Sequence, residues 1–352
     1  MNKKKLARLV AVCTACLGMG VFAFSGCKKG GDTSGSGGEG TEATTPTTPT
    51  TPTTPTTPTT PTTPTTPTTP TTPTTPTTPT TPTTPTTPTT PTTPTPEPEI
   101  SGPVQGGATI TKASAGELEA AYVEWTAAEN AKWYNVYVKE HDAADTAYTQ
   151  LDAPLVRQYK DYYRADAVGL KAGAYDMKVV PVNSDDEEVA DYPAYAKNIT
   201  VNAHERAGYA FTGGNVPGAY NMDGTLKTGA QVVYVTAANA KTVTATVNGA
   251  EVTGFQSIID ARQKNNLEQT PLCFRIVGTV NKDDLDHISS KEEGLQIKGT
   301  EKTPAANITI EGIGSDGTIN GFGMLIRNSS YIEISNLGVI NFMDDGISLD
   351  TN

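Results

Sequence analysis

The segment Asn307-Ile-Thr-Ile310 is echoed further along the chain by Tyr331-Ile-Glu-Ile334, and Gly323-Met-Leu-Ile326 is echoed at nearly the same spacing by Gly346-Ile-Ser-Leu349. Each segment is a short β run, and glycine or asparagine occupies the corners between the runs. Runs at this spacing predict stacked rungs, in which only neighbouring rungs together bury a core. The repeat therefore predicts a right-handed parallel β-helix. At least three repeats are generally needed for stability. The two recognisable rungs are therefore predicted to be the first part of a solenoid, which is incomplete in this sequence.

The sequence before the repeat predicts further elements of the same domain. Gln231 to Thr236 is predicted to be a buried strand, and Phe274 to Val280 another. Between them, Gly254 to Lys264 carries apolar residues at helical spacing, which predicts a short helix. We place this domain at residues 204–352, because a glycine-rich stretch follows His204.

Residues 100–203 follow a different pattern, in which short alternating runs are separated by polar or glycine-containing turns. The runs are Leu118 to Trp125, Trp133 to Lys139, Tyr162 to Leu170, Tyr175 to Val182 and Ala196 to Val201. Several short strands with turn signals between them predict an antiparallel β-sandwich of about 100 residues. The chain is thus predicted to be all-β, with a sandwich followed by a parallel β-helix.

The N-terminal residues predict export. Lys3, Lys4, Lys5 and Arg8 precede an apolar run from Leu9 to Phe24, which is short for a membrane-spanning helix and typical of a signal sequence. An uncleaved membrane anchor is the alternative. The ending Phe24-Ser-Gly-Cys27 resembles the lipobox of bacterial lipoproteins, although Phe24 stands where leucine is usual. The resemblance implies a signal peptide at 1–26 and lipidation of Cys27, which would hold the protein at the bacterial cell surface.

A linker is predicted at residues 27–99. Its main part is an unbroken Thr-Thr-Pro repeat from Thr44 to Pro94. Proline at every third position, without apolar side chains to bury, favours an extended polyproline II conformation that spans up to about 160 Å. We expect a stalk, either bare or O-glycosylated.

Charge and cysteine usage narrow the functional classes. The chain has 26 Lys and Arg residues against 38 Asp and Glu residues, and four of the positive charges lie in the predicted signal. Such an acidic chain argues against a nucleic-acid partner, and it binds an acidic polymer only if a divalent cation mediates the contact. Cys273 is the one cysteine left after the signal and Cys27, so no internal disulfide is expected, and its apolar neighbours predict a buried, inert thiol.

The predicted sandwich resembles a fibronectin type III module. The resemblance rests on Trp125, Tyr137, Leu170, Gly173, Tyr175, Met177 and Val179. It implies that Trp125 fills the core and that Tyr175 takes the tyrosine-corner position. Sugar binding by this module is the alternative to a spacer role. We expect a spacer, because core packing accounts for both Trp125 and Trp133.

The C-terminal domain resembles the start of family 1 polysaccharide lyases, the pectate lyases. The matching segments are Gly218 to Lys227, Val232 to Thr236, Arg275 to Val280, Ile308 to Gly312, Ile332 to Leu337 and Asp344 to Asp350. The match runs over about 209–352 and covers roughly the first half of a lyase domain. It implies calcium-dependent β-elimination of polygalacturonate. Asp345 corresponds to the family's first calcium aspartate, and Asp344 is a weaker candidate.

The resemblance also implies what this chain does not contain. The family's remaining calcium carboxylates and its arginine base belong to rungs beyond Asn352, so no catalytic residue is assigned and the 352-residue chain alone is expected to be inactive. Arg275 and Arg327 lie outside the family's arginine motif. Two alternatives remain: a polygalacturonase-type hydrolase, since paired aspartates also activate water there, and a non-catalytic surface protein associated with polysaccharide. In each case we expect the chain to be a monomer.

A second acidic stretch is a weaker metal candidate. Asp283, Asp284, Asp286 and His287 lie close together in the sequence, but they occupy a polar segment between predicted strands. We therefore expect a solvated loop there. No phosphate-binding loop and no zinc spacing occur in the sequence.

Overall fold

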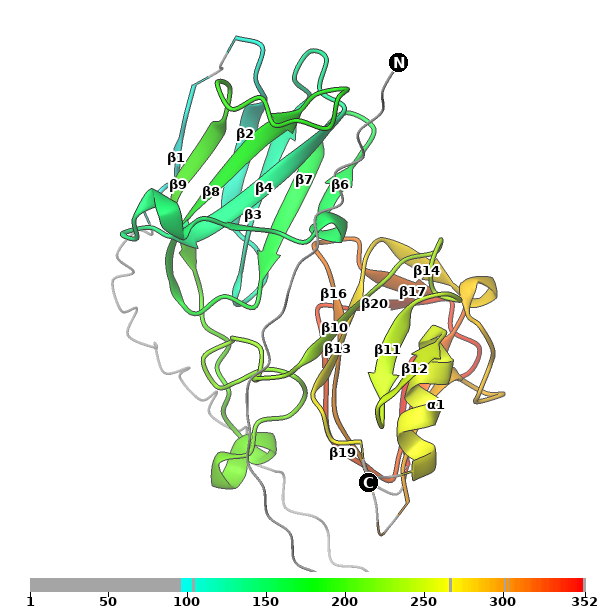
Figure 1. Ribbon diagram of the computed structural model, residues 1–352. Helices are drawn as coiled ribbons and strands as arrows, with labels where there is room; N and C mark the ends of the chain where they lie inside the picture. The colour runs from blue at the N-terminus through cyan, green and yellow to red at the C-terminus, as the bar shows by residue number, and fades with distance from the viewer. Residues whose placement is uncertain (1–95, 103–104, 266–267, 301, 303, 351–352) are drawn as a thin grey trace, which may run out of the picture. The chain divides into compact units, whose positions relative to one another are not determined.

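The computed structural model describes residues 96–102, 105–265, 268–300, 302 and 304–350 (Figure 1). The predicted signal sequence, Cys27 and the Thr-Thr-Pro repeat lie outside the described residues. All the described residues belong to one compact unit of the chain. They form strands, one α-helix and four short 3-10 helices, so the prediction of an all-β chain is confirmed at the level of class.

Residues 99–201, the two-sheet region, form two antiparallel sheets. One sheet has the order β1-β9-β8-β4-β5 and the other the order β2-β3-β7-β6. The strands are β1 (Glu99–Ile100), β2 (Thr109–Ala115), β3 (Ala120–Thr126), β4 (Trp133–Glu140), β5 (Thr149–Gln150), β6 (Val156–Gln158), β7 (Tyr163–Val168), β8 (Gly173–Val182) and β9 (Ala194–Val201). Two 3-10 helices, η1 (Asp145–Ala147) and η2 (Ala153–Leu155), flank β5.

Alternating apolar side chains from both sheets form the core of the two-sheet region. Trp125 is fully buried there, stacks on Tyr163 at a ring-centroid distance of 5.8 Å and meets Tyr134 edge-on at 5.2 Å. Tyr175 is also buried. The role in core packing predicted for Trp125 is therefore confirmed, and the five predicted runs correspond to β3, β4, β7, β8 and β9.

Residues 231–350, the three-sheet region, form three parallel sheets that the chain visits in turn. Their orders are β10-β13-β16-β19, β14-β17-β20 and β15-β18-β21. The strands are β10 (Gln231–Val235), β13 (Leu272–Ile276), β14 (Thr279–Asn281), β15 (Gly294–Lys298), β16 (Ala305–Gly312), β17 (Thr318–Asn320), β18 (Gly323–Arg327), β19 (Ser329–Ser335), β20 (Gly338–Ile340) and β21 (Ile347–Asp350). The 3-10 helices η3 (Tyr209–Gly214) and η4 (Lys282–Asp284) precede β10 and β15 respectively.

Side-chain alternation explains the core of the three-sheet region. Ile308 and Ile310 of β16 point into an apolar core, together with Phe274 of β13 and Met324 of β18. The intervening side chains of β16 lie on the opposite face, because successive residues of a strand alternate between faces. In-register pairing, such as Ile308 with Ile332, stacks like residues on neighbouring strands and keeps this core continuous.

Two details of the sequence prediction are corrected. The single strand expected over 274–280 is two strands, β13 and β14, because Gly278 adopts φ +67° and turns the chain between two sheets. The two expected rungs are joined by an earlier one, β13 to β15, whose pairing with the next rung is parallel and in register. That rung escaped detection because a polar segment without a strand, Lys282 to Glu293, separates β14 from β15 and obscures the repeat.

An insertion between β10 and β13 carries the hairpin of β11 (Thr244–Val247) and β12 (Ala250–Thr253) and the helix α1 (Phe255–Asn265). The predicted helix is confirmed, and its apolar residues Phe255, Ile258 and Ile259 are fully buried in the core of the three-sheet region. Within the described part of the chain, no helix is long and apolar enough to span a membrane.

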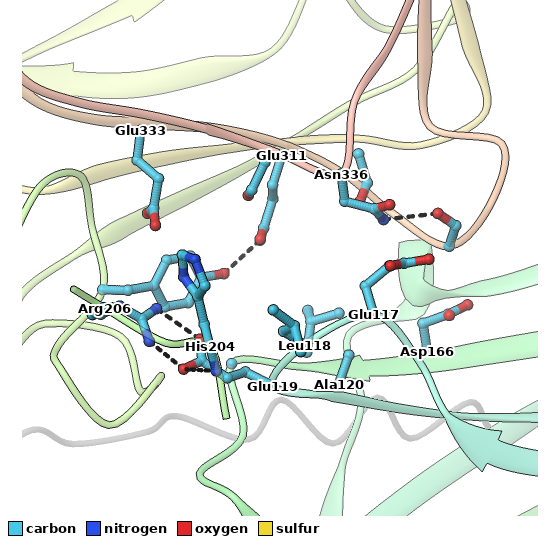
Figure 2. Close-up of a pocket in the computed structure, with 16 residues that line it drawn as sticks. Glu117, Leu118, Glu119, Ala120, Asp166, His204, Arg206, Glu311, Glu333 and Asn336 are labelled. Carbon is cyan, nitrogen blue, oxygen red and sulfur yellow. Dashed lines mark hydrogen bonds and ion pairs between the residues drawn. The ribbon is translucent and has the colours of Figure 1, made fainter. Parts of the chain in front are cut away.

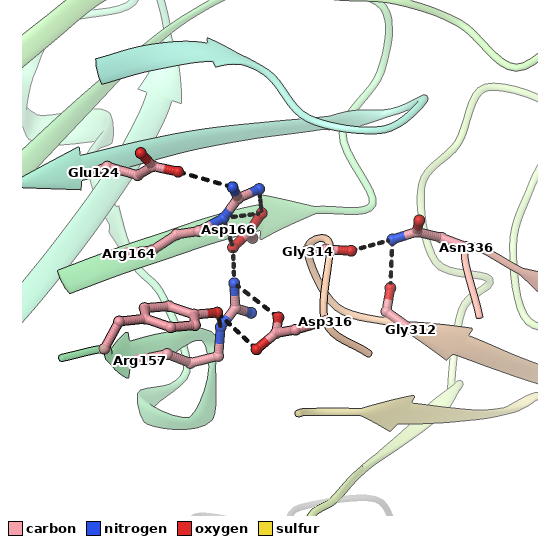
Figure 3. Close-up of polar contacts among 9 residues, drawn as sticks. Glu124, Arg157, Arg164, Asp166, Gly312, Gly314, Asp316 and Asn336 are labelled. Carbon is pink, nitrogen blue, oxygen red and sulfur yellow. Dashed lines mark hydrogen bonds and ion pairs between the residues drawn. The ribbon is translucent and has the colours of Figure 1, made fainter. Parts of the chain in front are cut away.

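Polar contacts join the two regions. Tyr159 donates a hydrogen bond to the Asp316 carboxylate at 2.8 Å, and Tyr234 donates one to Asp152 at 2.7 Å. Figure 3 shows Arg157 between Asp166 of β7 and Asp316 of the β16–β17 turn. These contacts join the ends of strands and the adjoining turns on both sides, so the junction has a defined polar interface.

Candidate functional site

Three carboxylates converge next to strand β21. Asp344 and Asp345 lie on the turn between β20 and β21, and Glu293 lies directly before β15. One carboxylate oxygen from each of the three residues lies within 4.8 Å of the others. Asp344 and Asp345 are exposed, whereas Glu293 is only 6% exposed. The two aspartates that the sequence predicted as metal ligands are thus together, and a buried third carboxylate joins them.

The local structure holds Glu293 in a fixed orientation. Its carboxylate accepts a hydrogen bond from the Ser290 hydroxyl, and its backbone carbonyl accepts one from the Gly323 N–H at 2.6 Å. Ser290 is itself buried. A carboxylate held by a neighbouring hydroxyl and by its own backbone loses little further freedom when it binds a ligand.

The close approach of the aspartate turn depends on Gly323. A Cβ at this position would overlap the carbonyl oxygen of Asp345 and lie 2.6 Å from that of Gly346. The absence of a side chain therefore lets the turn pack directly against the start of β18. The Gly346 carbonyl then accepts a hydrogen bond from Met324 N–H at 3.1 Å, which fixes the turn against the strand.

The donor set fits a hard divalent cation. Calcium binds six to eight oxygens at about 2.3–2.6 Å, so two ligands on opposite sides of one ion lie up to about 5 Å apart. The spacing of the Glu293, Asp344 and Asp345 oxygens is within that limit. With one oxygen from each carboxylate the set is incomplete, so water, backbone carbonyls or a bound carboxylate would complete it.

Glu293 was missed by the sequence prediction, although a signal for it exists. Gly294-Leu-Gln-Ile297 has the same form as the two recognised segments at Gly323 and Gly346, and it pairs in register with Gly323-Met-Leu-Ile326. In the first and third of these segments an acidic residue, Glu293 or Asp345, comes directly before the glycine. Aligning the three segments would have put both side chains at equivalent positions.

The two arginines of the strands in the three-sheet region are both ion-paired. Arg275 is buried, donates to Glu311 at 2.8 Å and also contacts the hydroxyls of Tyr220 and Tyr234. Arg327, at the end of β18, lies 3.0 Å from Asp350 and is 41% exposed, so it forms a surface salt bridge. Each of the two guanidinium groups is thus held by a carboxylate.

The acidic stretch at 283–287 has a structural role, which corrects the expectation of a solvated loop. Asp286 accepts hydrogen bonds from the backbone N–H groups of Gln256 and Ser257, at 2.8 and 3.0 Å, and so caps the start of α1. Burial acts to raise the pKa of Asp286, but a hydrogen bond from the Ser257 hydroxyl at 2.7 Å, together with the two backbone hydrogen bonds, outweighs it and lowers the pKa. His287 lies between Asp286 and Asp260, at 3.0 and 2.9 Å.

Cys273 is a free, buried thiol, as the sequence predicted. Burial, followed by the nearby Glu311 carboxylate, raises its pKa well above the usual range. A thiol that stays protonated is a poor nucleophile and a poor metal ligand. Cys273 is therefore not part of a candidate site.

Comparison with known proteins gives limited information. No protein-family model matches the sequence, and no curated protein matches it. Among solved structures, a pectate lyase from Pectobacterium carotovorum is similar at 12% sequence identity and a TM-score of 0.18. The similarity covers 62% of this chain and 58% of the lyase chain, so this chain spans less than two thirds of that protein. A similarity of this size is a weak likeness to a pectate lyase and establishes neither family nor activity.

Proposed function

We propose that the three-sheet region is the first part of a pectate-lyase-like, right-handed parallel β-helix and that the two-sheet region is a fibronectin type III module. The function that we propose is calcium-dependent binding and β-elimination of polygalacturonate, carried out by the lyase domain to which these rungs belong. One observation supports it above all: Asp345, which the sequence motif marks as the calcium aspartate, lies with Asp344 and the buried Glu293 in one carboxylate cluster.

The residues of this cluster have distinct roles in the proposal. Glu293, fixed by Ser290, provides a preorganised ligand from inside the region, and Asp344 and Asp345 provide ligands from the exposed turn. A bound calcium ion would neutralise the cluster and attract the carboxylate of a uronic acid, and it would acidify the proton next to that carboxylate. The acidic chain would otherwise repel such a polymer.

The elimination step needs a base, and we assign none among the described residues. Arg275 is buried in its contact with Glu311, and Arg327 is paired with Asp350. We therefore separate two properties of the chain. Calcium-dependent polymer binding is proposed for the 352 residues themselves, whereas elimination is proposed for a lyase domain that also supplies the base.

A binding assay and an activity assay test these properties. In affinity electrophoresis through a gel containing polygalacturonate, the full chain should be retarded with calcium and should migrate freely with EDTA. Asp345→Asn should lose the retardation, and Asp283→Asn, which replaces an exposed carboxylate on η4, should keep it. Retardation that is equal in EDTA would contradict the proposal.

The product chemistry separates the lyase from the alternative hydrolase. β-Elimination creates an unsaturated uronic acid that absorbs in the ultraviolet, whereas hydrolysis creates reducing ends without that absorbance. A chain extended by further rungs should produce the absorbance only with calcium. Reducing ends without absorbance would favour the polygalacturonase-type hydrolase. The absence of both signals would favour a non-catalytic binding protein.

We also propose that Cys27 carries the lipid that attaches the protein to the bacterial cell surface. The support is the basic and apolar N-terminal sequence that ends at this cysteine. Cys27→Ser should move the protein from the membrane fraction to the soluble fraction. Unchanged membrane association would instead favour an uncleaved anchor.

A further inference from the structure

A cavity of about 180 Å³ lies at the junction of the two regions. Figure 2 shows Glu311 and Glu333 on one side of it, projecting from β16 and β19, and residues 117–120 on the other. Glu117 and Leu118 are exposed, so the cavity opens to solvent on their side. The cavity is smaller than the roughly 300–1,000 Å³ typical of pockets for drug-sized ligands, so it suits a small molecule or the end of a flexible chain.

The floor of the cavity is the outward face of two paired strands. Strand β16 pairs in register with β19, so that Thr309 lies opposite Glu333 and Glu311 lies opposite Ser335. Residues two apart on one strand share a face, so Glu333 and Ser335 are neighbours about 7 Å apart on β19. Glu333, Glu311 and Ser335 all line the cavity, so the floor brings oxygen-bearing side chains from both strands together.

Glu333 is a carboxylate without an ion-pair partner. It accepts one hydrogen bond, from the Thr309 hydroxyl at 3.0 Å, and among the described residues no lysine, arginine or histidine nitrogen forms an ion pair with it. Burial raises its pKa, and the neighbouring Glu311 adds to this effect. The bond from Thr309 and the charges of Arg206 and His204 act in the opposite direction but do not outweigh it. A cation beside this carboxylate would favour its charged form.

The arginines and the lysine around the floor are already engaged elsewhere. Arg206 binds Glu119 through both terminal nitrogens, and its buried Nε does not open on the cavity. Arg275 donates to Glu311 at 2.8 Å. The Lys227 ammonium donates to two backbone carbonyls, at 2.7 and 2.6 Å. Each of these cations is held by its own partners, so none is free to neutralise the remaining carboxylate of the floor.

The other polar groups of the lining are mainly acceptors. Glu117, at the mouth, is a second carboxylate without an ion pair in the described part of the chain, whereas Asp166 is held by two arginines. The Asn336 amide nitrogen donates to two backbone carbonyls, both at 2.8 Å, which leaves its oxygen as an acceptor. The Ser335 hydroxyl and the His204 ring are each able to donate or to accept. Where imidazole is neutral, the unpaired charges of the lining are therefore two carboxylates.

We propose that this cavity binds the primary ammonium group of a small organic molecule, next to Glu333. An ammonium group donates three hydrogen bonds and carries the one positive charge that Glu333 lacks. A carboxylate ligand would face Glu333 and Glu117, and a neutral ligand would leave both of them unpaired. A metal ion is less suited, because among the described residues the one group of three close metal-ligating atoms is that of Glu293, Asp344 and Asp345.

This site is separate from the carboxylate cluster at Glu293, Asp344 and Asp345. None of those three residues lines the cavity. The sheet face that carries Thr309, Glu311 and Glu333 belongs to β16 and β19, whereas the cluster lies beside β15, β18 and β21. Binding of the amine therefore needs no divalent cation. Experiments with EDTA present keep the two proposals apart, since either one is able to fail without the other.

The test uses two amines, each with a neutral counterpart of similar shape. D-Galactosamine is compared with D-galactose, and 1,5-diaminopentane with 1,5-pentanediol, by ligand-observed NMR titration of the full chain in EDTA at pH 7.5 and about 0.15 M salt. At least one amine should bind about tenfold or more tightly than its counterpart, because a charge-assisted hydrogen bond replaces a neutral one. Preference for the ring amine would identify an amino sugar, and preference for the linear amine would identify a polyamine or a lysine-like chain end.

Variants identify the groups responsible. Glu333→Gln keeps the shape and still accepts from Thr309, so it should abolish the preference for the amine without loss of stability in urea unfolding. Glu117→Gln changes an exposed side chain, so it should fold normally and weaken amine binding several-fold. Glu251→Gln replaces an exposed carboxylate of β12 outside the cavity lining. It is the matched control for general attraction of amines to an acidic chain, with unchanged binding.

Three results would overturn the proposal. The first is that neither amine binds the wild-type chain more tightly than its neutral counterpart, which would mean that water or a neutral ligand fills the cavity. The second is equal amine binding by Glu333→Gln and the Glu251→Gln control, which would move the amine to another acidic surface. The third is a clear loss of stability in Glu333→Gln, which would show that the protein itself supplies the partner of this carboxylate.

Discussion

At the scale of single residues, missing side chains decide how closely segments pack. Gly323 lets the aspartate turn reach β18, and Gly218 lets the segment before β10 lie against the face of β16 and β19. Gly218 adopts φ +68°, and a Cβ there would overlap the Thr309 hydroxyl and lie 2.7 Å from a Glu333 carboxylate oxygen. Both kinds of constraint, conformational and steric, act at this position.

Gly218→Ala should therefore destabilise the protein by about 2 kcal/mol or more. Gly229→Ala is the matched control, because its φ is +76° and a Cβ there would meet nothing within 4 Å. That control should cost about 1 kcal/mol, from backbone strain alone. Urea unfolding measures both. Equal losses for the two variants would show that the overlap at Gly218 is relieved without cost.

At the scale of elements, a histidine links the helix to a loop between strands. His287 contacts Asp260 of α1 and Asp286, which caps the same helix. Burial lowers the pKa of His287, but the two carboxylates outweigh it and the net shift is upward. A raised pKa in the folded state stabilises the protein below the unfolded pKa of about 6.5, and this stabilisation disappears as the pH rises through the folded pKa.

His287→Gln should accordingly destabilise the protein more at pH 5.5 than at pH 8.5. His287 is 43% exposed, so solvent screening limits the difference to less than about 1 kcal/mol. Urea unfolding at the two pH values measures it. His204→Gln is the control, because the His204 ring forms no ion pair with a carboxylate among the described residues. A larger loss of unfolding free energy at pH 8.5 than at pH 5.5 would contradict a stabilising charge interaction between His287 and the two carboxylates.

The elements were predicted with unequal success, for identifiable reasons. Strands β3, β4, β7, β8 and β9 were predicted because each carries a long alternating run. Strand β2 was missed, since Lys112 and Ser114 interrupt its apolar residues. The carboxylate cluster was predicted only in part, because Glu293 is far from Asp344 in the sequence and only parallel stacking brings the two together. The Arg206 contact with Glu119 likewise joins distant segments, and no local pattern encodes it.

At the scale of the whole described unit, a buried ion pair joins the two-sheet region to the segment that leads into the three-sheet region. Arg206 Nη2 donates to Glu119 at 2.7 Å, and a second contact joins the same two groups. A Cβ at Gly224 would overlap Glu119, so the segment at 218–227 also packs tightly on this pair. The sandwich was expected to be a spacer, and these contacts give it a structural role in addition.

Arg206→Met should destabilise the protein by about 3–5 kcal/mol, because it leaves the buried Glu119 charge without its partner. The double variant Glu119→Gln, Arg206→Met should lose less than the sum of the single losses. Lys132→Met is the control, since its pair with Asp186 is exposed and contributes less than about 1 kcal/mol. Differential scanning calorimetry should show one transition for the wild type and two for Arg206→Met. Strictly additive losses would show that the pair does not couple the regions.

Calcium titration of the full chain by isothermal titration calorimetry tests the central claim most directly. The carboxylate cluster predicts one calcium ion per chain, with a dissociation constant of about 10⁻⁴–10⁻³ M, the range of weak calcium sites with few protein ligands. Asp345→Asn and Glu293→Gln should each weaken binding at least about tenfold, and Asp283→Asn should leave it unchanged. No calcium binding by the wild type, or equal binding by Asp345→Asn, would contradict the account.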